Sequence, residues 1–75
     1  MNKYLADELY KTAYNHLQKR NYGKSAVLFE KLLKDYPKNL SVLKNLSHCY
    51  AFMREFEKAE NFKKLSWQSF NTSKH

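Results

Sequence analysis

The sequence predicts an all-α protein of four antiparallel helices. Three observations predict it: apolar residues recur every three or four positions, only one Gly and one Pro occur in 75 residues, and similar residues return after 34 positions. The first is the period of an amphipathic helix, the second leaves little material for hairpin turns, and the third indicates two copies of one helical unit. The predicted helices span residues 3–19, 24–36, 41–54 and 57–70.

The first predicted helix has its apolar residues on one face. Leucine or alanine recurs at every fourth position from Leu5 to Leu17, so that a single stripe can face a core. We expect the helix to end in residues 20–23. Gly23 is the residue of that segment that takes a positive φ without steric cost.

The second predicted helix ends at the only proline. A residue that precedes proline is pushed out of the α region, so Tyr36 closes this helix ahead of Pro37. The third predicted helix then needs an N-terminal cap, which Asn39 or Ser41 can provide. The fourth follows a turn at Arg54 that contains no Gly or Pro, and it is placed by its match to the first half of the chain.

The composition limits the classes of function. The chain makes one small domain, residues 1–75, with 14 Lys and Arg against 7 Asp and Glu. The net charge of +7 favours an acidic partner, which can be a protein, a membrane surface or nucleic acid. One Cys excludes an internal disulfide and fits a reducing compartment. Because no secretion signal and no membrane-spanning apolar run is seen, we expect a cytoplasmic location.

A repeat of 34 residues covers most of the chain, and equivalent positions keep their size or character. Examples are Leu9 with Leu43, Ala13 with Ser47, Arg20 with Arg54, Ser25 with Ala59, and Tyr36 with Phe70. A period of 34 residues with two helices in each unit resembles the tetratricopeptide repeat. The resemblance divides the chain into repeat one, residues 6–39, and repeat two, residues 40–73, with a frayed tail at residues 71–75.

Repeat one matches the motif of that family more fully than repeat two. The matching residues of repeat one are Leu9, Thr12, Ala13, His16, Ser25, Phe29 and Pro37. Those of repeat two are Leu43, Leu46, Ser47, Tyr50 and Ala59. Repeat two departs at Lys63, where the family has an aromatic residue, and at Asn71, where it has proline. A generic four-helix bundle with chance similarity is the alternative.

Four small residues occupy the positions where helix axes are expected to approach closely. They are Ala13, Ser25, Ser47 and Ala59. One hairpin cannot bury its apolar face alone, so the resemblance implies that two hairpins stack into a short α-solenoid.

The resemblance also implies a concave groove, lined by the first helix of each unit, in which family members bind peptides. The positions that match are Tyr10, Lys11, Tyr14, Leu17, Gln18, Lys44, Asn45, His48, Ala51 and Phe52. Aromatic rings there offer rigid contact area, and Lys and Asn offer donors for a carboxylate or a carbonyl. We expect a protein or peptide partner of acidic character. The alternative is that the tyrosines cover the core edge and the lysines are a solvated face.

A second candidate surface lies on the last helix, which has too many large apolar residues for one inner face. They are Phe62, Leu65, Trp67 and Phe70. We expect part of this set to be covered by another chain, as a homodimer or a heterodimer. The resemblance adds a narrower role, because some small family members are secretion chaperones that sheath a helix of their partner. The alternative is that Trp67 packs fully onto the third helix.

The residue pattern argues against an enzyme. His48 and Cys49 are adjacent on a helix and point about 100° apart, so they do not form a metal site. His16 lies at a packing position, and no phosphate loop occurs. We expect no catalytic residue, metal or cofactor. The alternative function is a basic helical protein that binds nucleic acid through the lysines of the second and fourth helices.

Overall fold

The computed structural model describes residues 1–72, with side chains described for residues 1–68, and this part of the chain holds four α-helices and no strand. They are α1 (Lys3–Gln18), α2 (Tyr22–Asp35), α3 (Leu40–Phe52) and α4 (Phe56–Thr72). Each end lies within two residues of its predicted position. The all-α prediction is therefore confirmed.

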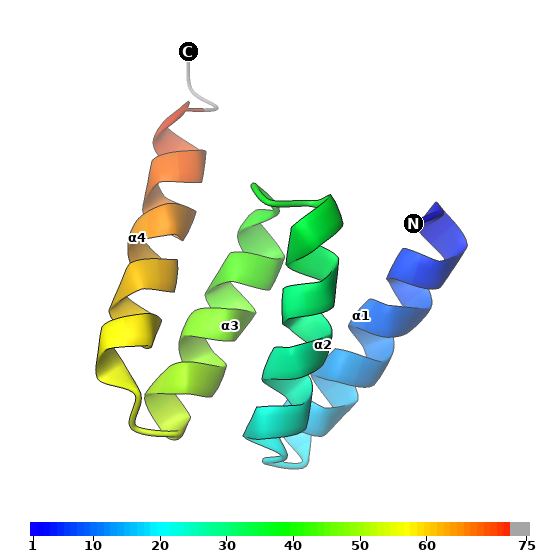
Figure 1. Ribbon diagram of the computed structural model, residues 1–75, viewed down its shortest axis with the longest axis horizontal. Coiled ribbons are helices and arrows are strands. Elements are labelled where there is room, and N and C mark those ends of the chain that lie inside the picture. Colours follow the sequence, from blue (N-terminus) through cyan, green and yellow to red (C-terminus); the bar gives the residue numbers. More distant parts are fainter. Residues whose placement is uncertain (73–75) are drawn as a thin grey trace.

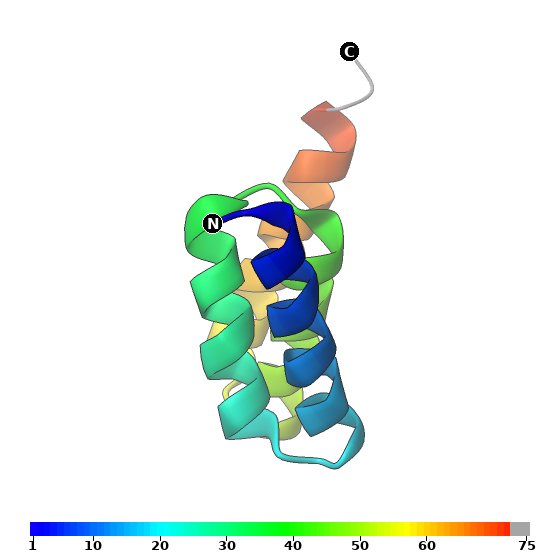
Figure 2. The same cartoon turned by 90° about the vertical axis from the view of Figure 1, so that its right-hand side faces the viewer.

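The helices lie side by side in chain order, and each packs against the next (Figure 1). Seen from the side of α1, the pair α1 and α2 stands in front, with α3 and α4 behind it (Figure 2). The Cα positions extend over 36 × 32 × 16 Å. A flat arrangement of consecutive antiparallel hairpins has two end faces, one beside α1 and one beside α4.

The two hairpin turns have the same backbone geometry, 34 residues apart. Arg20 and Arg54 both adopt positive φ, at 66° and 64°. The next N–H reaches back five residues in each turn: from Asn21 to the His16 carbonyl and from Glu55 to the Tyr50 carbonyl, both at 2.8 Å. This is the Schellman arrangement of a helix C-terminus.

The prediction that Gly23 provides the positive φ was wrong. Gly23 lies in the first turn of α2, and its φ is not positive. The physical reason is hydrogen bonding. The Schellman bonds close only if the left-handed residue stands directly after the last turn of α1, and that residue is Arg20.

Asparagine side chains begin two of the helices. The Asn39 side-chain oxygen accepts a hydrogen bond from the Val42 N–H at 3.0 Å, and Asn2 does the same for the Leu5 N–H at 2.8 Å. Asn39 is thus the cap of α3, the first of the two predicted candidates. As predicted, α2 ends ahead of Pro37.

The predicted small residues lie where the helices of each hairpin meet. The Ser25 hydroxyl donates to the Ala13 carbonyl at 2.7 Å, and the Ser47 hydroxyl donates to the Ala59 carbonyl at 2.9 Å. A side-chain oxygen can reach the backbone of the facing helix only at close approach. In the first hairpin the donor, Ser25, lies on the second helix. In the second hairpin the donor, Ser47, lies on the first helix. The two hairpins therefore make the same kind of contact, but the donor and acceptor helices are exchanged.

The core lies between the hairpins as well as within them. Phe29 of α2 and Leu43, Leu46 and Cys49 of α3 are buried almost completely. Burial of these groups is the main force that holds α2 against α3. The second hairpin therefore closes the core of the first.

Candidate protein-interaction surface

The predicted groove residues of α1 are partly engaged within the protein. The Tyr10 hydroxyl lies 2.5 Å from the Ser41 hydroxyl and accepts a hydrogen bond from the Asn45 side-chain amide at 2.9 Å. Its ring stacks on Tyr14 with a centroid distance of 6.2 Å and meets Phe29 edge-on at 5.4 Å. Tyr10 and Asn45 thus join α1 to α3, and so connect the two hairpins.

Other predicted groove residues remain accessible. Tyr14 is 41% exposed and Phe52 is 59% exposed. Phe52 stacks on Tyr22 at 4.9 Å, and the His48 ring lies 6.2 Å from it. Two separate aromatic groups therefore mark this surface. Lys11, Gln18 and Lys44 are exposed, whereas Leu17 packs against the core.

The predicted patch on α4 divides between inside and outside. The Phe62 ring stacks on the Tyr50 ring at 5.6 Å and is half-buried. Leu65 is 46% exposed and Trp67 is 64% exposed. The alternative that Trp67 packs fully onto α3 is therefore wrong. The side chain of Phe70 lies outside the described residues.

A hollow of about 810 Å³ lies between α3 and α4. It joins residues from both predicted surfaces: Lys44 and His48 from the groove, and Trp67 from the patch. It adds Phe56 and Lys63, which the sequence analysis did not assign to a protein-binding surface. The signal that could have found them is the repeat, because residues 34 positions earlier pack against α3.

The hollow combines basic groups with exposed rings. Lys44, Lys63 and Lys64 line it, and Glu60 is the carboxylate among its lining residues. Phe56, which is 66% exposed, adds apolar area to that of the tryptophan. The volume of the hollow lies in the range of ligand pockets in proteins. The mixture of positive charge and aromatic surface suits an amphipathic segment with acidic groups.

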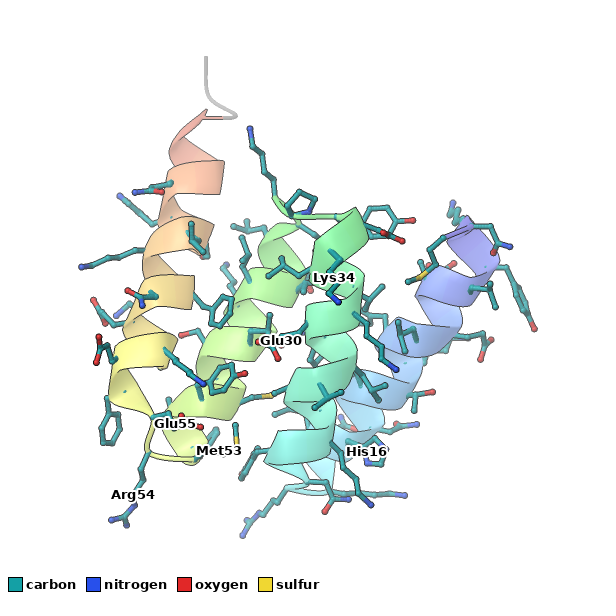
Figure 3. All side chains as sticks on the ribbon, viewed as in Figure 1. His16, Glu30, Lys34, Met53, Arg54 and Glu55 are labelled. Carbon is teal, nitrogen blue, oxygen red and sulfur yellow. The ribbon has the colours of Figure 1, made fainter. Side chains whose placement is uncertain are left out.

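Tyr50 connects three helices. Its hydroxyl donates to the Glu30 carboxylate at 2.9 Å, and the Lys58 ammonium lies 5.3 Å from its ring centroid. Glu30 reaches from α2 toward α3 to make this bond (Figure 3). Burial first, and then the hydrogen bond to Glu30, raise the pKa of Tyr50 to about 12. This cluster holds α2, α3 and α4 together.

Cys49 and His16 both make contacts within the fold. Cys49 is buried, its thiol lies 3.5 Å from the Ser25 hydroxyl, and burial raises its pKa, which makes it a poor nucleophile. His16 is half-buried beside Asn21. Among the described residues, no cluster of three or more His, Cys, Asp and Glu side chains could hold a metal ion.

Within residues 1–72, no helix is both long enough and apolar enough to cross a membrane. Comparison of the chain with protein-family models, with curated proteins and with solved structures found no match.

Proposed function

We propose that the protein is a stoichiometric protein-binding module, built of two tetratricopeptide-like hairpins, whose partner docks in the hollow between α3 and α4. The observation that carries the proposal is the hollow itself. It places the exposed rings of Phe56 and Trp67 beside three lysines. Large rings in a concave site are the residues that dominate binding free energies between proteins.

The arrangement favours binding over turnover. Cys49 is enclosed in the core, and the exposed His48 lies beside Phe52, on a face that carries rings and lysines. The groups that line the hollow are suited to hold a partner by burial of apolar area and by charge. A partner bound in this way is released unchanged.

The first test is capture of a partner on the immobilised chain, followed by calorimetry with the purified partner. Wild type is compared with Trp67→Asp, which alters the hollow, and with a Tyr14→Ala, Phe52→Ala double variant, which alters the predicted groove. We expect a one-to-one complex. We expect Trp67→Asp to weaken it by about 2 kcal/mol or more, roughly thirtyfold, and the double variant to change it little.

Two results would contradict the proposal. In one, the purified partner binds all three proteins equally, which would remove the hollow as the site. In the other, the partner is chemically converted in the presence of the chain. Circular dichroism and thermal unfolding check that each variant keeps its fold, because Phe52 stacks on Tyr22 and Tyr14 stacks on Tyr10.

Nucleic-acid binding is the competing function, because the lysines of α2 and α4 are exposed. They include Lys24, Lys31, Lys34, Lys58, Lys63 and Lys64. Electrophoretic shift with a mixed single-stranded oligonucleotide at two salt concentrations separates the two functions. A shift at low salt that falls steeply with added salt supports nucleic-acid binding. We expect no shift at either concentration.

A further inference from the structure

We propose that the occupant of the hollow is an acidic amphipathic α-helix of a partner protein, seated against α3 and α4 in the way that α3 is seated against α1 and α2. This inference rests on the proposed function and deepens it, because it states the shape, the charge and the register of the partner.

The first hairpin supplies the template. Several side-chain contacts join α3 to α1 and α2, and four of them serve as the template: Asn45 with Tyr10, Cys49 with Ser25, Tyr50 with Glu30, and Phe52 with Tyr22. On α1 and α2 these contacts use Tyr10, Ser25, Glu30 and Tyr22. The residues 34 positions later are, in the same order, Lys44, Ala59, Lys64 and Phe56. All four line the hollow. The hollow is thus the second hairpin's version of the face on which α3 sits.

The differences between the two faces predict the charge of the occupant. Where α3 meets the Glu30 carboxylate, the hollow has the Lys64 ammonium, and where it meets the Tyr10 hydroxyl, the hollow has Lys44. The fully buried ring of Phe29 corresponds to Lys63. Glu60, which corresponds to Ala26, adds one carboxylate to these three cationic groups. The balance stays positive and favours acidic residues on the opposite side.

Two positions keep uncharged side chains. Ser25 corresponds to Ala59 and Tyr22 to Phe56, and both of the later residues line the hollow. The occupant therefore needs small or apolar side chains where α3 has Cys49 and an aromatic ring where α3 has Phe52. Acidic residues belong at the places of Asn45 and Tyr50, which flank that apolar stripe.

A second copy of the chain does not fit this description. The helix that would dock head to tail is α1, and it places Lys11, Asn15, His16 and Gln18 where α3 has its four contact residues. Lys11 would then face Lys44, and His16 is already half-buried beside Asn21. Two chains that each carry a net charge of +7 also repel each other. The occupant is therefore a helix from another protein.

The test uses two synthetic helices that copy residues 38–54 of this chain. The acidic probe carries Asn45→Glu, Cys49→Ala and Tyr50→Glu, and the basic probe carries Asn45→Lys, Cys49→Ala and Tyr50→Lys. A staple between the positions of Lys44 and His48 keeps both helical, because short helices are marginal in water. Trp67 is the only tryptophan and lines the hollow, so its fluorescence reports binding.

We expect the acidic probe to bind the wild-type chain roughly tenfold more tightly than the basic probe at low salt. The Lys44→Glu, Lys64→Glu double variant should reverse the preference. The matched control is Lys31→Glu, Lys34→Glu, which changes the net charge equally on exposed lysines of α2 and should keep the wild-type preference. Reversal in one variant and not in the other assigns the acid preference to the hollow.

Several results would overturn the inference. If the basic probe binds wild type as tightly as the acidic probe, the hollow accepts helices but has no acid preference, and the proposed function stands. If neither probe changes the Trp67 fluorescence at millimolar concentration, a helix in the α3 register is not the occupant. The proposed function is then tested separately, by the capture experiment. If a single-stranded oligonucleotide displaces the acidic probe, the lysines serve nucleic acid instead.

Discussion

Two arginines take a backbone conformation that usually belongs to glycine. Arg20 and Arg54 stand at the ends of α1 and α3 with positive φ. Their 34-residue match was visible in the sequence, but the conformation was assigned to Gly23. The error arose because residue preference names glycine, whereas the hydrogen bonds that close a helix require the first residue after its last turn. Position thus outweighed residue type.

Replacing Arg54 by glycine should stabilise the protein. A non-glycine residue in the left-handed region costs about 1–2 kcal/mol, and glycine loses about 0.5–1 kcal/mol of that gain through the entropy of the unfolded chain. The Arg54 side chain points away from the helices (Figure 3). We expect a higher urea midpoint for Arg54→Gly and an unchanged one for Arg54→Ala. Equal midpoints for the two variants would contradict this explanation of the turn.

Gly23 should be replaceable by alanine with a gain in stability. A methyl group at this position meets no atom within 4 Å, and its helical conformation suits alanine better than glycine. The expected gain is about 0.5–1 kcal/mol in the free energy of unfolding. Urea denaturation measures it, and a loss of stability would return Gly23 to the turn-forming role that the sequence analysis gave it.

Tyr50 should make the stability of the fold depend on alkaline pH. Its pKa is raised to about 12 in the folded protein, so the folded state holds the phenol proton more tightly than the unfolded state does. The contribution is complete below the unfolded value of about 10 and is lost as the pH rises through about 12.

The measurement for Tyr50 is the urea midpoint of wild type and Tyr50→Phe across this pH range. The variant lacks the ionisable group, so it should lose less stability than wild type between pH 10 and pH 12. Near neutral pH the free energy of unfolding of Tyr50→Phe should be lower than that of wild type by about 1 kcal/mol, because the variant lacks the hydrogen bond to Glu30. Parallel losses in the two proteins would show that other groups control the alkaline transition.

At the scale of helices, the spacing of apolar residues placed the elements, and the turn before the fourth was placed by its match to the first half of the chain. Each helix has a stripe that repeats every three or four residues, and Pro37 interrupts the chain where α2 ends. The close-approach residues were also predictable, because Ala13 and Ser47 are small at the same position of each unit. The direction of the serine hydrogen bond in each hairpin was not predicted, because it depends on which of the two facing small residues carries the hydroxyl.

Enlarging Ala59 should destabilise the α3–α4 hairpin. Its carbonyl accepts the Ser47 hydrogen bond at 2.9 Å and its side chain is buried, so Ala59→Leu overpacks the contact and costs ~1–3 kcal/mol. Ala51→Leu is the control, because Ala51 is exposed on α3. Thermal unfolding should show a lower midpoint for the first variant only. Similar midpoints would mean that the two helices are not closely packed at Ala59.

At the scale of the whole molecule, the two end faces differ. The α1 end places polar groups such as Lys11 and Asn15 where α3 has its contact residues, whereas the α4 end has the hollow with Trp67. The sequence analysis found the apolar excess of the last helix and part of the groove. It did not find the hollow, because Phe56, Lys63 and Lys64 each look like ordinary surface residues until α3 and α4 are packed.

The isolated chain should be a monomer. A second copy offers the hollow no acidic helix, and the net charge of +7 opposes self-association. Sedimentation equilibrium at micromolar concentration should give the chain mass of 9.0 kDa, with Trp67 quenched by iodide. A stable dimer with a protected tryptophan would support the homodimer expected as one possibility from the sequence.

The central claim is that the partner binds at the α3–α4 end of the molecule, and an amide chemical-shift map tests it most directly. The nitrogen-labelled chain is titrated with the acidic helical probe. We predict that the largest shifts fall at the backbone amides of Lys44, His48, Ala59 and Lys63, around the hollow. Shifts concentrated instead on Tyr14 and Gln18 of α1, or spread evenly over all four helices, would contradict the claim.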